Sequence, residues 1–316
     1  MMSPSDPISV AVLDDYQRVA LTLADWTPIQ ERARVDVYRD HLADPSAVID
    51  RLQPYDIVCV MRERTPLTKE ILEKLPRLKL ICSTGARNAS IDTATATARG
   101  IEIAHTGYFS APTIEHTWGL ILASARFITQ ESASLRAGGW QTTVGEDMAG
   151  HTLGIIGLGN VGAAVAKIGL AFGMHVIAWS QNLTEAAATA VGARWVSKED
   201  LLRQADIVSI HVVLSKRTRG LIAAADLALM KPTARLINTS RGPIVVEADL
   251  IRALEERRIA GAAVDVFDTE PLPKDHAFRR IDTVLATPHI GYVSRDLYRR
   301  FYGDTVRNIL EWLDRH

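Results

Sequence analysis

The stretch Leu153-Gly-Ile-Ile-Gly157-Leu-Gly159-Asn160-Val161-Gly162 decides the fold class of this chain. A short apolar run leads directly into glycines spaced G-x-G-x-x-G, and a helical pattern follows over residues 163–172. In such a strand–turn–helix unit, Gly157 permits the tight turn, Gly159 lets the backbone approach a pyrophosphate, and Gly162 allows close packing of helix on strand. The start of the helix offers unpaired N–H groups and a positive dipole end to phosphates. The stretch therefore predicts a dinucleotide-binding turn.

Apolar runs of strand length alternate with helical patterns on both sides of this turn. Before it, the expected strands cover residues 8–13, 57–60, 78–82 and 101–104. From the turn onward, they cover residues 153–156, 175–179, 207–211, 234–238, 261–265 and 284–286. Buried strands separated by helices are typical of parallel sheets covered on both faces. The pattern predicts an α/β fold with two doubly wound parallel sheets.

The order of these elements predicts an insertion. With 316 residues, the chain exceeds what one hydrophobic core usually serves. A long apolar-rich helix is expected over residues 111–137, and an amphipathic helix over residues 294–312. We expect a Rossmann cofactor domain at 105–291, inserted into a flavodoxin-like substrate domain made of 1–104 and 292–316.

The composition favours small-molecule chemistry. The formal net charge is −1, so no basic excess is present to replace phosphate counterions, and we expect no nucleic-acid partner. Without a signal peptide or a long uncharged apolar stretch, the chain is expected to be cytoplasmic and to bind no membrane. Cys59 and Cys82 each lie inside an apolar run, which favours buried, reduced thiols. No histidine pair has zinc-site spacing, so we expect no metal.

The residues after the second strand of the cofactor domain bear on cofactor choice. The sequence reads Trp179-Ser180-Gln181-Asn182, with Ser180 where an acid usually binds the ribose 2′-hydroxyl. Its absence removes the repulsion that a 2′-phosphate would meet, although no Arg or Lys lies beside Ser180 to attract one. We expect Ser180, Gln181 and Asn182 to contact NAD(P)H, with a slight preference for NADPH and NADH use left open.

Three chemically suggestive side chains follow predicted strands, where open α/β sheets place their ligands. Arg241 follows the strand at 234–238, Glu270 the strand at 261–265, and His289 the strand at 284–286. Taken singly, each could be a surface cation, a helix-starting acid or a loop histidine. Together they supply an arginine for a carboxylate, a histidine that protonates a developing alkoxide, and an acid that orients the histidine. The combination predicts hydride reduction of a 2-oxo acid.

The chain resembles the D-isomer-specific 2-hydroxyacid dehydrogenase family, which includes phosphoglycerate dehydrogenase and glyoxylate/hydroxypyruvate reductase. The likeness covers nearly the whole chain. Its strongest segments are Gly157-Leu-Gly-Asn-Val-Gly162, Asn238-Thr-Ser-Arg-Gly-Pro243, Asp265-Val-Phe-Asp-Thr-Glu-Pro271 and Thr287-Pro-His-Ile-Gly291, with weaker ones at Arg62-Glu-Arg-Thr65, Ser83-Thr-Gly-Ala86 and Glu115-His-Thr-Trp118.

The resemblance implies roles for single residues in reduction. Arg241 would orient the substrate, His289 would be the acid/base, and Glu270 its partner. Asp265 would hold the nicotinamide carboxamide.

Further implied contacts lie around these residues. His211 and Thr239 would contact the cofactor. The loops around Arg64 and Gly85, the latter with Ala86 and Arg87, would cradle the substrate carboxylate. Members of the family are usually homodimers built around the helix that corresponds to residues 111–137.

Two departures from the family pattern change what can be expected. Val213 replaces the proline of the usual His-x-Pro-Leu after His211. Arg87 stands where many members have a small or apolar residue, and it could recognise a second polar group of the substrate or serve the surface.

Three other functions share parts of this pattern. Reduction of a 2-imino acid to a D-amino acid would use the same carboxylate contact at Arg241. A formate dehydrogenase is disfavoured, because glutamine would then replace Glu270. A cofactor-sensing binding protein is the third, and the joint presence of Arg241, Glu270 and His289 favours catalysis over it.

Overall fold

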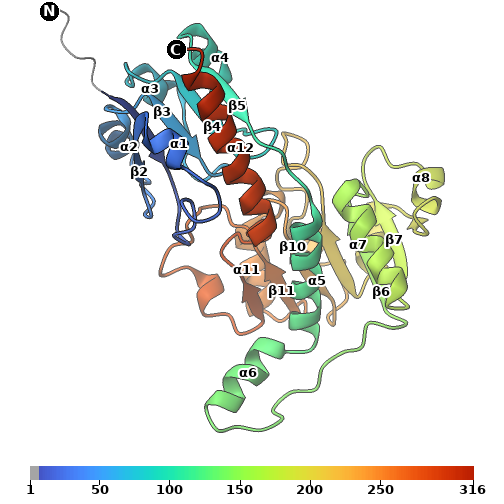
Figure 1. Ribbon diagram of the computed structural model, residues 1–316. Helices are drawn as coiled ribbons and strands as arrows, with labels where there is room; N and C mark the ends of the chain where they lie inside the picture. The colour runs from blue at the N-terminus through green and yellow to red at the C-terminus, as the bar shows by residue number, and fades with distance from the viewer. Residues whose placement is uncertain (1–6) are drawn as a thin grey trace, which may run out of the picture. The chain divides into compact units, whose positions relative to one another are not determined.

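The computed structural model describes residues 7–316, which form two compact units (Figure 1). One unit contains residues 7–109 together with Val293–His316, and the other contains Ser110–Tyr292. The first unit is therefore built from both ends of the chain.

The first unit is a five-stranded parallel sheet. Its strand order is β2-β1-β3-β4-β5, the doubly wound order of flavodoxin-like folds. The strands are β1 (Ile8–Val12), β2 (Ala33–Val37), β3 (Ile57–Val60), β4 (Leu80–Ser83) and β5 (Glu102–His105). Residues of β1, β3 and β4 are almost entirely buried, which explains their uninterrupted apolar runs.

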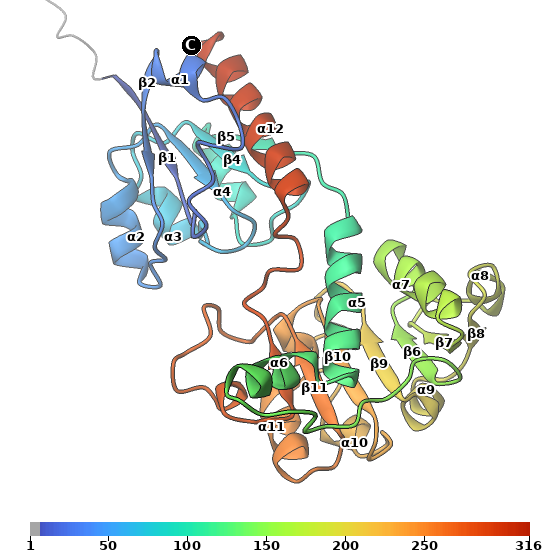
Figure 2. The same ribbon diagram turned by 60° about the horizontal axis from the view of Figure 1, so that its bottom comes forward.

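Within residues 7–316, five helices cover this sheet, and four of them begin at side-chain caps. They are α1 (Thr27–Gln30), α2 (Pro45–Leu52), α3 (Lys69–Glu73), α4 (Thr93–Ala98) and α12 (Arg295–Leu313). The side chains of Asp44, Thr68, Asp92 and Ser294 each accept a backbone N–H at a helix start. Helix α12 packs on β4 and β5, so the end of the chain completes the unit that its beginning forms (Figure 2).

The second unit is a seven-stranded parallel sheet in the order β12-β11-β10-β9-β6-β7-β8. The strands are β6 (Thr152–Ile156), β7 (His175–Trp179), β8 (Arg194–Trp195), β9 (Ile207–Ile210), β10 (Arg235–Asn238), β11 (Gly261–Val264) and β12 (Val284–Ala286). Its first six strands have the 3-2-1-4-5-6 order of a Rossmann sheet. The order reverses between β6 and β9, so the loops after these two strands face the crevice where such sheets bind ligands.

Two helices of this unit precede its first strand, and the others lie between its strands. They are α5 (Ala111–Ala125), α6 (Ile128–Arg136), α7 (Asn160–Ala171), α8 (Glu185–Thr189), α9 (Lys198–Gln204), α10 (Ala224–Leu227) and α11 (Glu247–Glu255), with short 3-10 turns η1 (Gly242–Ile244) and η2 (Ala277–Arg279). The helix α5 packs on α7 and β11. The predicted fold class, α/β with two doubly wound parallel sheets, is confirmed.

Two strands were absent from the prediction. The edge strand β2 alternates polar and apolar residues, and Arg34 pairs with Asp36 at 2.9 Å on its exposed side. The edge strand β8 has only two residues, both exposed. Edge strands of this kind lack the continuous apolar run that marks a strand buried on both faces.

The single long helix expected at 111–137 is wrong. The helix is interrupted at Phe127, which adopts the left-handed conformation with φ 52°. Helix α5 therefore ends, and α6 starts in a new direction. The Phe127 ring lies against the guanidinium of buried Arg235, whose Cζ is 5.1 Å from the ring centroid. The contact that stabilises the interruption at Phe127 thus comes from a residue more than a hundred positions away in the sequence. The residues next to Phe127 do not indicate it.

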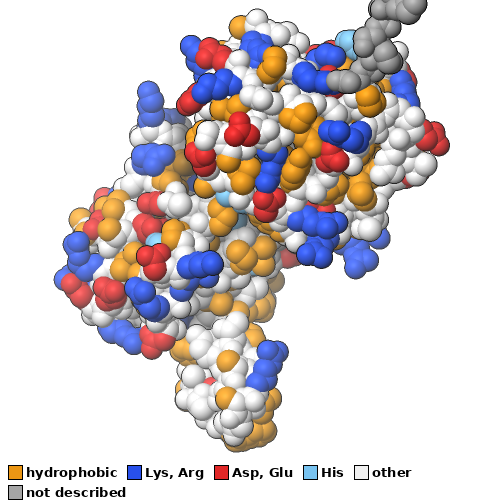
Figure 3. Space-filling view, turned by 90° about the vertical axis from the view of Figure 1, so that its left-hand side faces the viewer, with side chains coloured by type: hydrophobic (Ala, Val, Ile, Leu, Met, Phe, Trp, Pro, Cys, Tyr) orange, Lys and Arg blue, Asp and Glu red, His pale blue; other side chains and the backbone are white. Residues whose placement is uncertain are grey.

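The segment that starts with α6 carries apolar side chains on its surface. Figure 1 shows α6 away from the sheet of its own unit, and Figure 3 shows orange side chains on this segment at the foot of the view. Ile128, Leu135, Trp140 and Val144 expose 52%, 59%, 75% and 91% of their surface. We call residues 128–147 the arm.

No helix within residues 7–316 is long and apolar enough to cross a membrane. Cys59 and Cys82 are buried free thiols on neighbouring strands and lie opposite each other in register. The hydrogen bond with the Cys82 thiol, together with burial, raises the pKa of Cys59 well above its ordinary value.

Candidate active site

The turn after β6 has the shape that the glycine spacing predicts. Gly157 has φ 99°, a left-handed conformation that strongly favours glycine. A Cβ on Gly162 would lie 2.0 Å from the Gly157 carbonyl oxygen, so only glycine fits where α7 packs against the turn. Gly159 is the N-cap of α7, and a Cβ there would meet nothing within 4 Å. The first turn of α7, starting with Asn160 and Val161, thus opens toward free space, as a dinucleotide pyrophosphate requires.

The residues expected at the ribose lie in a turn directly after β7. Ser180 is half-buried, whereas Gln181 and Asn182 are exposed, and the Ser180 carbonyl accepts the N–H of Leu183 at 3.1 Å. The turn is therefore ordered by its own backbone, and its polar side chains remain at the surface.

His211 lies at the end of β9, beside the glycine turn. Its backbone N–H donates to the Ile156 carbonyl at 2.7 Å, and a Cβ on Gly157 would lie 2.8 Å from the His211 carbonyl. Its Nε2 and the Ser209 hydroxyl are 2.8 Å apart. Burial lowers the pKa of His211 from 6.5 to about 4, so the imidazole is neutral near pH 7.

The low pKa of His211 makes the stability of the protein depend on pH. Between about pH 6.5 and 4, unfolded His211 binds a proton and folded His211 does not, so the free energy of unfolding falls as the pH falls. A fall in the pKa from 6.5 to about 4 corresponds to a loss of up to about 3 kcal/mol in the free energy of unfolding. We expect thermal melting to show this decline in the parent and a flatter one in His211→Gln. An equally steep decline in both proteins would contradict the assignment.

Arg241 is presented by the loop after β10. The Asn238 side chain donates to the Arg241 carbonyl at 3.0 Å and accepts the Ser240 N–H at 3.0 Å, which ties the loop to the end of the strand. The Arg241 guanidinium donates to the Ser240 carbonyl at 2.7 Å, and the backbone is extended. Thr239 is held from another side, because its hydroxyl lies 2.9 Å from that of Thr117 on α5.

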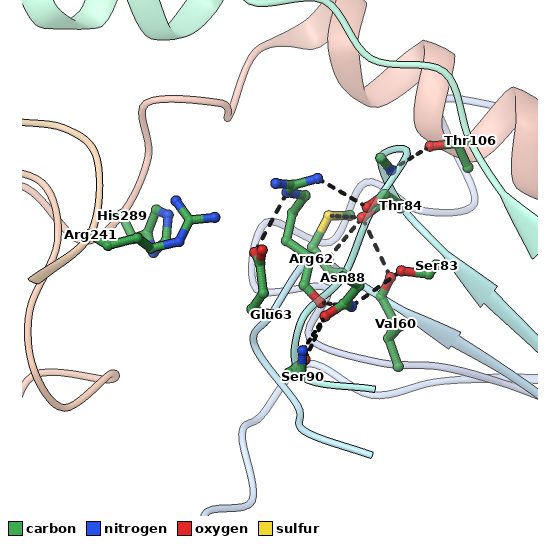
Figure 4. Close-up of polar contacts among 12 residues, drawn as sticks. Val60, Arg62, Glu63, Ser83, Thr84, Asn88, Ser90, Thr106, Arg241 and His289 are labelled. Carbon is green, nitrogen blue, oxygen red and sulfur yellow. Dashed lines mark hydrogen bonds and ion pairs between the residues drawn. The ribbon is translucent and has the colours of Figure 1, made fainter. Parts of the chain in front are cut away.

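Glu270 and His289 are in direct contact. His289 Nδ1 donates to Glu270 Oε2 at 2.5 Å, and the other carboxylate oxygen, Oε1, accepts the N–H of Phe267 at 3.0 Å. The two side chains are 32% and 22% exposed, so both remain accessible. With Nδ1 committed to Glu270, Nε2 is the nitrogen that can exchange a proton with a ligand. Figure 4 shows Arg241 and His289 on their loops.

Asp265 is 1% exposed and holds the loop that carries His289. Its Oδ1 accepts the Thr287 hydroxyl at 2.6 Å and the Ile290 N–H at 2.9 Å, and its Oδ2 accepts the Gly291 N–H at 2.8 Å. His116 on α5 reaches the same carboxylate, with Nε2 3.3 Å from Oδ1. Both oxygens of Asp265 are thus engaged by the protein.

In the first unit, the predicted substrate loops follow β3 and β4. Gly85 has φ 83°, and its N–H donates to the Thr106 hydroxyl at 2.8 Å. Ala86 and Arg87 are exposed on the same turn. Asn88 anchors the turn, because its amide nitrogen donates to the Arg62 carbonyl and the Ser83 hydroxyl (Figure 4).

Arg64 is fixed by the loop after β1. Its guanidinium donates to the Asp14 carbonyl at 3.0 Å and lies over the Tyr16 ring, 4.6 Å from the centroid. The Asp14 carboxylate accepts the hydroxyl of neighbouring Thr65 at 2.7 Å. The loops after β1 and β3 therefore form one polar cluster at the carboxyl edge of the sheet.

Some supporting residues were missed by the sequence reasoning. Thr287, Thr117 and Ser209 carry hydrogen bonds to predicted site residues, but a threonine or serine gives no signal of such a role. Phe267 contributes through its backbone N–H, which is independent of its side chain. Within residues 7–316, no group of three or more His, Cys, Asp or Glu side chains could hold a metal.

Comparisons with known proteins show the family to which the chain is similar. Residues 118–291 match the family model of the D-isomer-specific 2-hydroxyacid dehydrogenase NAD-binding domain. The chain is 37% identical over 294 residues to a glyoxylate reductase from Thermococcus litoralis, covering 89% of this chain and 88% of that protein. A phosphoglycerate oxidoreductase from Vibrio cholerae o395 has a similar structure, with a TM-score of 0.92, 32% identity and coverage of 98% and 100%. An acyclic imino acid reductase in complex with NADPH and D-Arg is similar with a TM-score of 0.74 and 27% identity, covering 98% of each chain.

Proposed function

The chain belongs to the D-isomer-specific 2-hydroxyacid dehydrogenase family and is a nicotinamide-dependent oxidoreductase, and from this premise we propose that it reduces a small 2-oxo acid to the D-2-hydroxy acid. The contact between His289 and Glu270 carries the proposal. A histidine whose Nδ1 is held by a carboxylate can present a proton at Nε2 to an oxygen that gains charge. An arginine on the neighbouring loop, Arg241, can bind a carboxylate in two-point fashion.

Each residue group has a role in this reaction. When bound, the nicotinamide supplies the hydride. The glycine turn at 157–162 accepts the pyrophosphate, and neutral His211 lies beside the turn as part of its wall. Arg241 polarises the carbonyl and binds the carboxylate, and His289 gives its Nε2 proton to the oxygen as charge develops. Glu270 stabilises the imidazolium before this transfer and fixes the tautomer after it.

Two further roles follow the resemblance. We assign the loop around half-buried Arg64 and the exposed residues Ala86 and Arg87 to the substrate carboxylate. Because the Gly85 N–H already donates to Thr106, Gly85 would act by shaping the turn. Asp265 would hold the nicotinamide carboxamide while its carboxylate also accepts hydrogen bonds from the loop that carries His289.

The proposal is tested by following the loss of nicotinamide absorbance with glyoxylate, hydroxypyruvate, phenylpyruvate and larger 2-oxo acids. NADPH and NADH are compared in parallel, with and without ammonia. Oxidation with a 2-oxo acid alone supports the proposal. Turnover that requires ammonia would instead support reduction of a 2-imino acid, the second candidate, which the likeness to the imino acid reductase favours. Tight cofactor binding without any turnover would overturn both.

Ser180 is the residue through which we expect the cofactor preference to act. It stands in the turn after β7 in place of an acid, and a carboxylate there would repel a 2′-phosphate and bind a 2′-hydroxyl. We expect Ser180→Asp to lower kcat/KM for NADPH by about tenfold or more relative to NADH, as one unfavourable charge contact of about 1.4 kcal/mol would. Steady-state kinetics with both cofactors measure the ratio, with Ser180→Asn as the uncharged control. An unchanged ratio in Ser180→Asp would remove Ser180 from cofactor selection.

We also propose that the enzyme is a homodimer assembled through the arm. The arm is held together by its own hydrogen bonds. Glu131 on α6 accepts the N–H and hydroxyl of Thr142 and the hydroxyl of Thr143 at 2.7–2.9 Å. The arm nevertheless exposes Leu135 and Trp140, and ordered apolar surface of this kind is typical of an interface.

Sedimentation tests the homodimer. The parent is expected to sediment at twice the chain mass of 34.7 kDa, and the pair Leu135→Asp with Trp140→Asp at the monomer mass. A charge placed at the centre of an apolar interface opposes association strongly. The control variant combines Lys69→Asp with Glu73→Asp, two exposed positions on α3. A parent that sediments as a monomer at micromolar concentration would contradict the proposal.

A further inference from the structure

Glu247 binds the loop that carries Glu270 with both of its carboxylate oxygens. It is the first residue of α11, and the loop is the segment that follows β11, residues 265–276. Oε2 accepts the N–H of Asp268 at 3.2 Å, and Oε1 accepts from His276 Nε2 at 2.9 Å. The Glu247 and His276 side chains are only 19% and 15% exposed, so water competes little for these bonds.

The hydrogen bonds of His276 define its tautomer. Nδ1 accepts the N–H of Phe278 at 3.2 Å, as the cap of η2, so this nitrogen carries no proton. Nε2 then carries the proton that is donated to Glu247. The ring also packs against Phe278, with centroids 4.9 Å apart. Each nitrogen of His276 thus has one partner, and the ring joins α11 to η2.

A short run of backbone connects this pair to the site. Asp268, whose N–H Glu247 holds, directly follows Phe267, whose N–H donates to Glu270 Oε1. On its other face, this backbone lies against Gly242, where a Cβ would be 2.1 Å from the Phe267 carbonyl carbon. The backbone of Phe267 and Asp268, which lies between the Gly242 backbone and the Glu247 side chain, therefore has little room to move. Its position sets where the Glu270 carboxylate lies.

Other charged groups surround the loop. Asp268 has its pKa raised by burial and by the charge of Glu247, with Arg219 and His276 acting in the opposite direction. Arg279 donates to the Pro273 and Leu272 carbonyls at 2.8 Å and closes the far side of the loop. The cluster thus contains the acids Glu247, Asp268 and Glu270, the histidines His276 and His289, and the two arginines Arg219 and Arg279.

We propose that Glu247 and His276 are a positioning pair that holds the Glu270 carboxylate on His289. The proposal rests on the proposed function, and it adds two residues that touch neither cofactor nor substrate in it. If the pair is broken, the Phe267–Glu270 segment gains freedom, and Oε2 spends less time on His289 Nδ1. The imidazolium then loses part of its stabilisation, and the tautomer that presents Nε2 is less strictly kept.

Two substitutions of His276 separate this role from simple packing. His276→Gln keeps an N–H donor near the position of Nε2 and loses the Phe278 cap. His276→Asn keeps an acceptor near the position of Nδ1 and cannot reach Glu247. We expect His276→Asn to lower kcat by about 10- to 100-fold, as a displaced catalytic group would, with KM changed less than about threefold. We expect His276→Gln to retain kcat within about threefold.

Two further readouts would not move if the role were structural only. In His276→Asn, the pH above which reduction declines should fall, because a histidine without its carboxylate gives up its proton at lower pH. The downfield proton resonance of the His289 Nδ1–H bond to Glu270 should weaken in His276→Asn and persist in His276→Gln. Glu247→Gln, which keeps one acceptor oxygen, should be intermediate in both measurements.

The outcomes are distinct. Equal kcat in the parent and His276→Asn would overturn the proposal, and equal impairment in His276→Asn and His276→Gln would do the same by assigning the effect to the cap. Melting temperature and NADPH binding confirm that each variant is folded. A parent that turns over no 2-oxo or 2-imino acid would refute the proposed function, whereas the proton resonance would still report whether the pair holds Glu270 on His289.

Discussion

We expect His289→Ala to lower kcat/KM for the 2-oxo acid by about 10²–10⁴-fold, the usual range for loss of a general acid. The affinity for NADPH should change little, because His289 lies on the loop after β12 and the phosphate turn lies after β6. Removal of the imidazole also leaves Glu270 Oε2 without the donor that it meets at 2.5 Å. Steady-state kinetics and titration of cofactor fluorescence measure the two quantities separately.

A matched control for this variant is His175→Ala. His175 begins β7 and is exposed, so its side chain can be removed without disturbing the site. It should retain full activity. If His289→Ala kept more than about one tenth of the parent kcat/KM, another group would be the proton donor.

Gly159→Ala is expected to weaken cofactor binding by tenfold or more while leaving the fold intact. A Cβ at this position meets no protein atom within 4 Å, and φ is −80°, so the free energy of unfolding should change by no more than about 1 kcal/mol. The same methyl group would occupy the space from which the pyrophosphate approaches the N–H groups of α7. Isothermal titration with NADPH and chemical unfolding measure the two effects.

Gly162→Ala provides the contrast, because its Cβ would lie 2.0 Å from the Gly157 carbonyl oxygen. This variant should lose about 1–3 kcal/mol of stability from overpacking, together with cofactor affinity. A Gly159→Ala protein that bound NADPH as tightly as the parent would mean that the dinucleotide does not lie over this turn.

Much of this architecture could be predicted because its signals are local. The glycines at 157–162 combine a left-handed turn, an open N-cap and a close helix contact, and few other structures need all three. Gly100, with φ 70°, follows α4 in the left-handed conformation that glycine commonly adopts after a helix. The pairing of Glu270 with His289 was expected from the resemblance, and the structure brings the two side chains together.

What could not be predicted depends on distant partners. Phe127 looks like any apolar residue of a helix, and its left-handed backbone makes sense only with Arg235 beneath the ring. The engagement of the Gly85 N–H by Thr106, and of Asp265 by the loop of His289, arises between segments about twenty residues apart. No sequence pattern connects Glu247 with His276, because their hydrogen bond depends on how the loop after β11 folds back onto α11.

Arg241, Glu270 and His289 all belong to the second unit, and each is held by hydrogen bonds within that unit. The other residues proposed to meet the substrate carboxylate beside Arg241 lie around Arg64, Ala86 and Arg87, in the first unit. Under the proposed function, substitutions in residues 7–109 can change selectivity without disturbing the hydrogen bonds that hold Arg241, Glu270 and His289. Natural variation and laboratory recombination could exchange the first unit while the second stays constant, so that the same catalytic residues act on different acids.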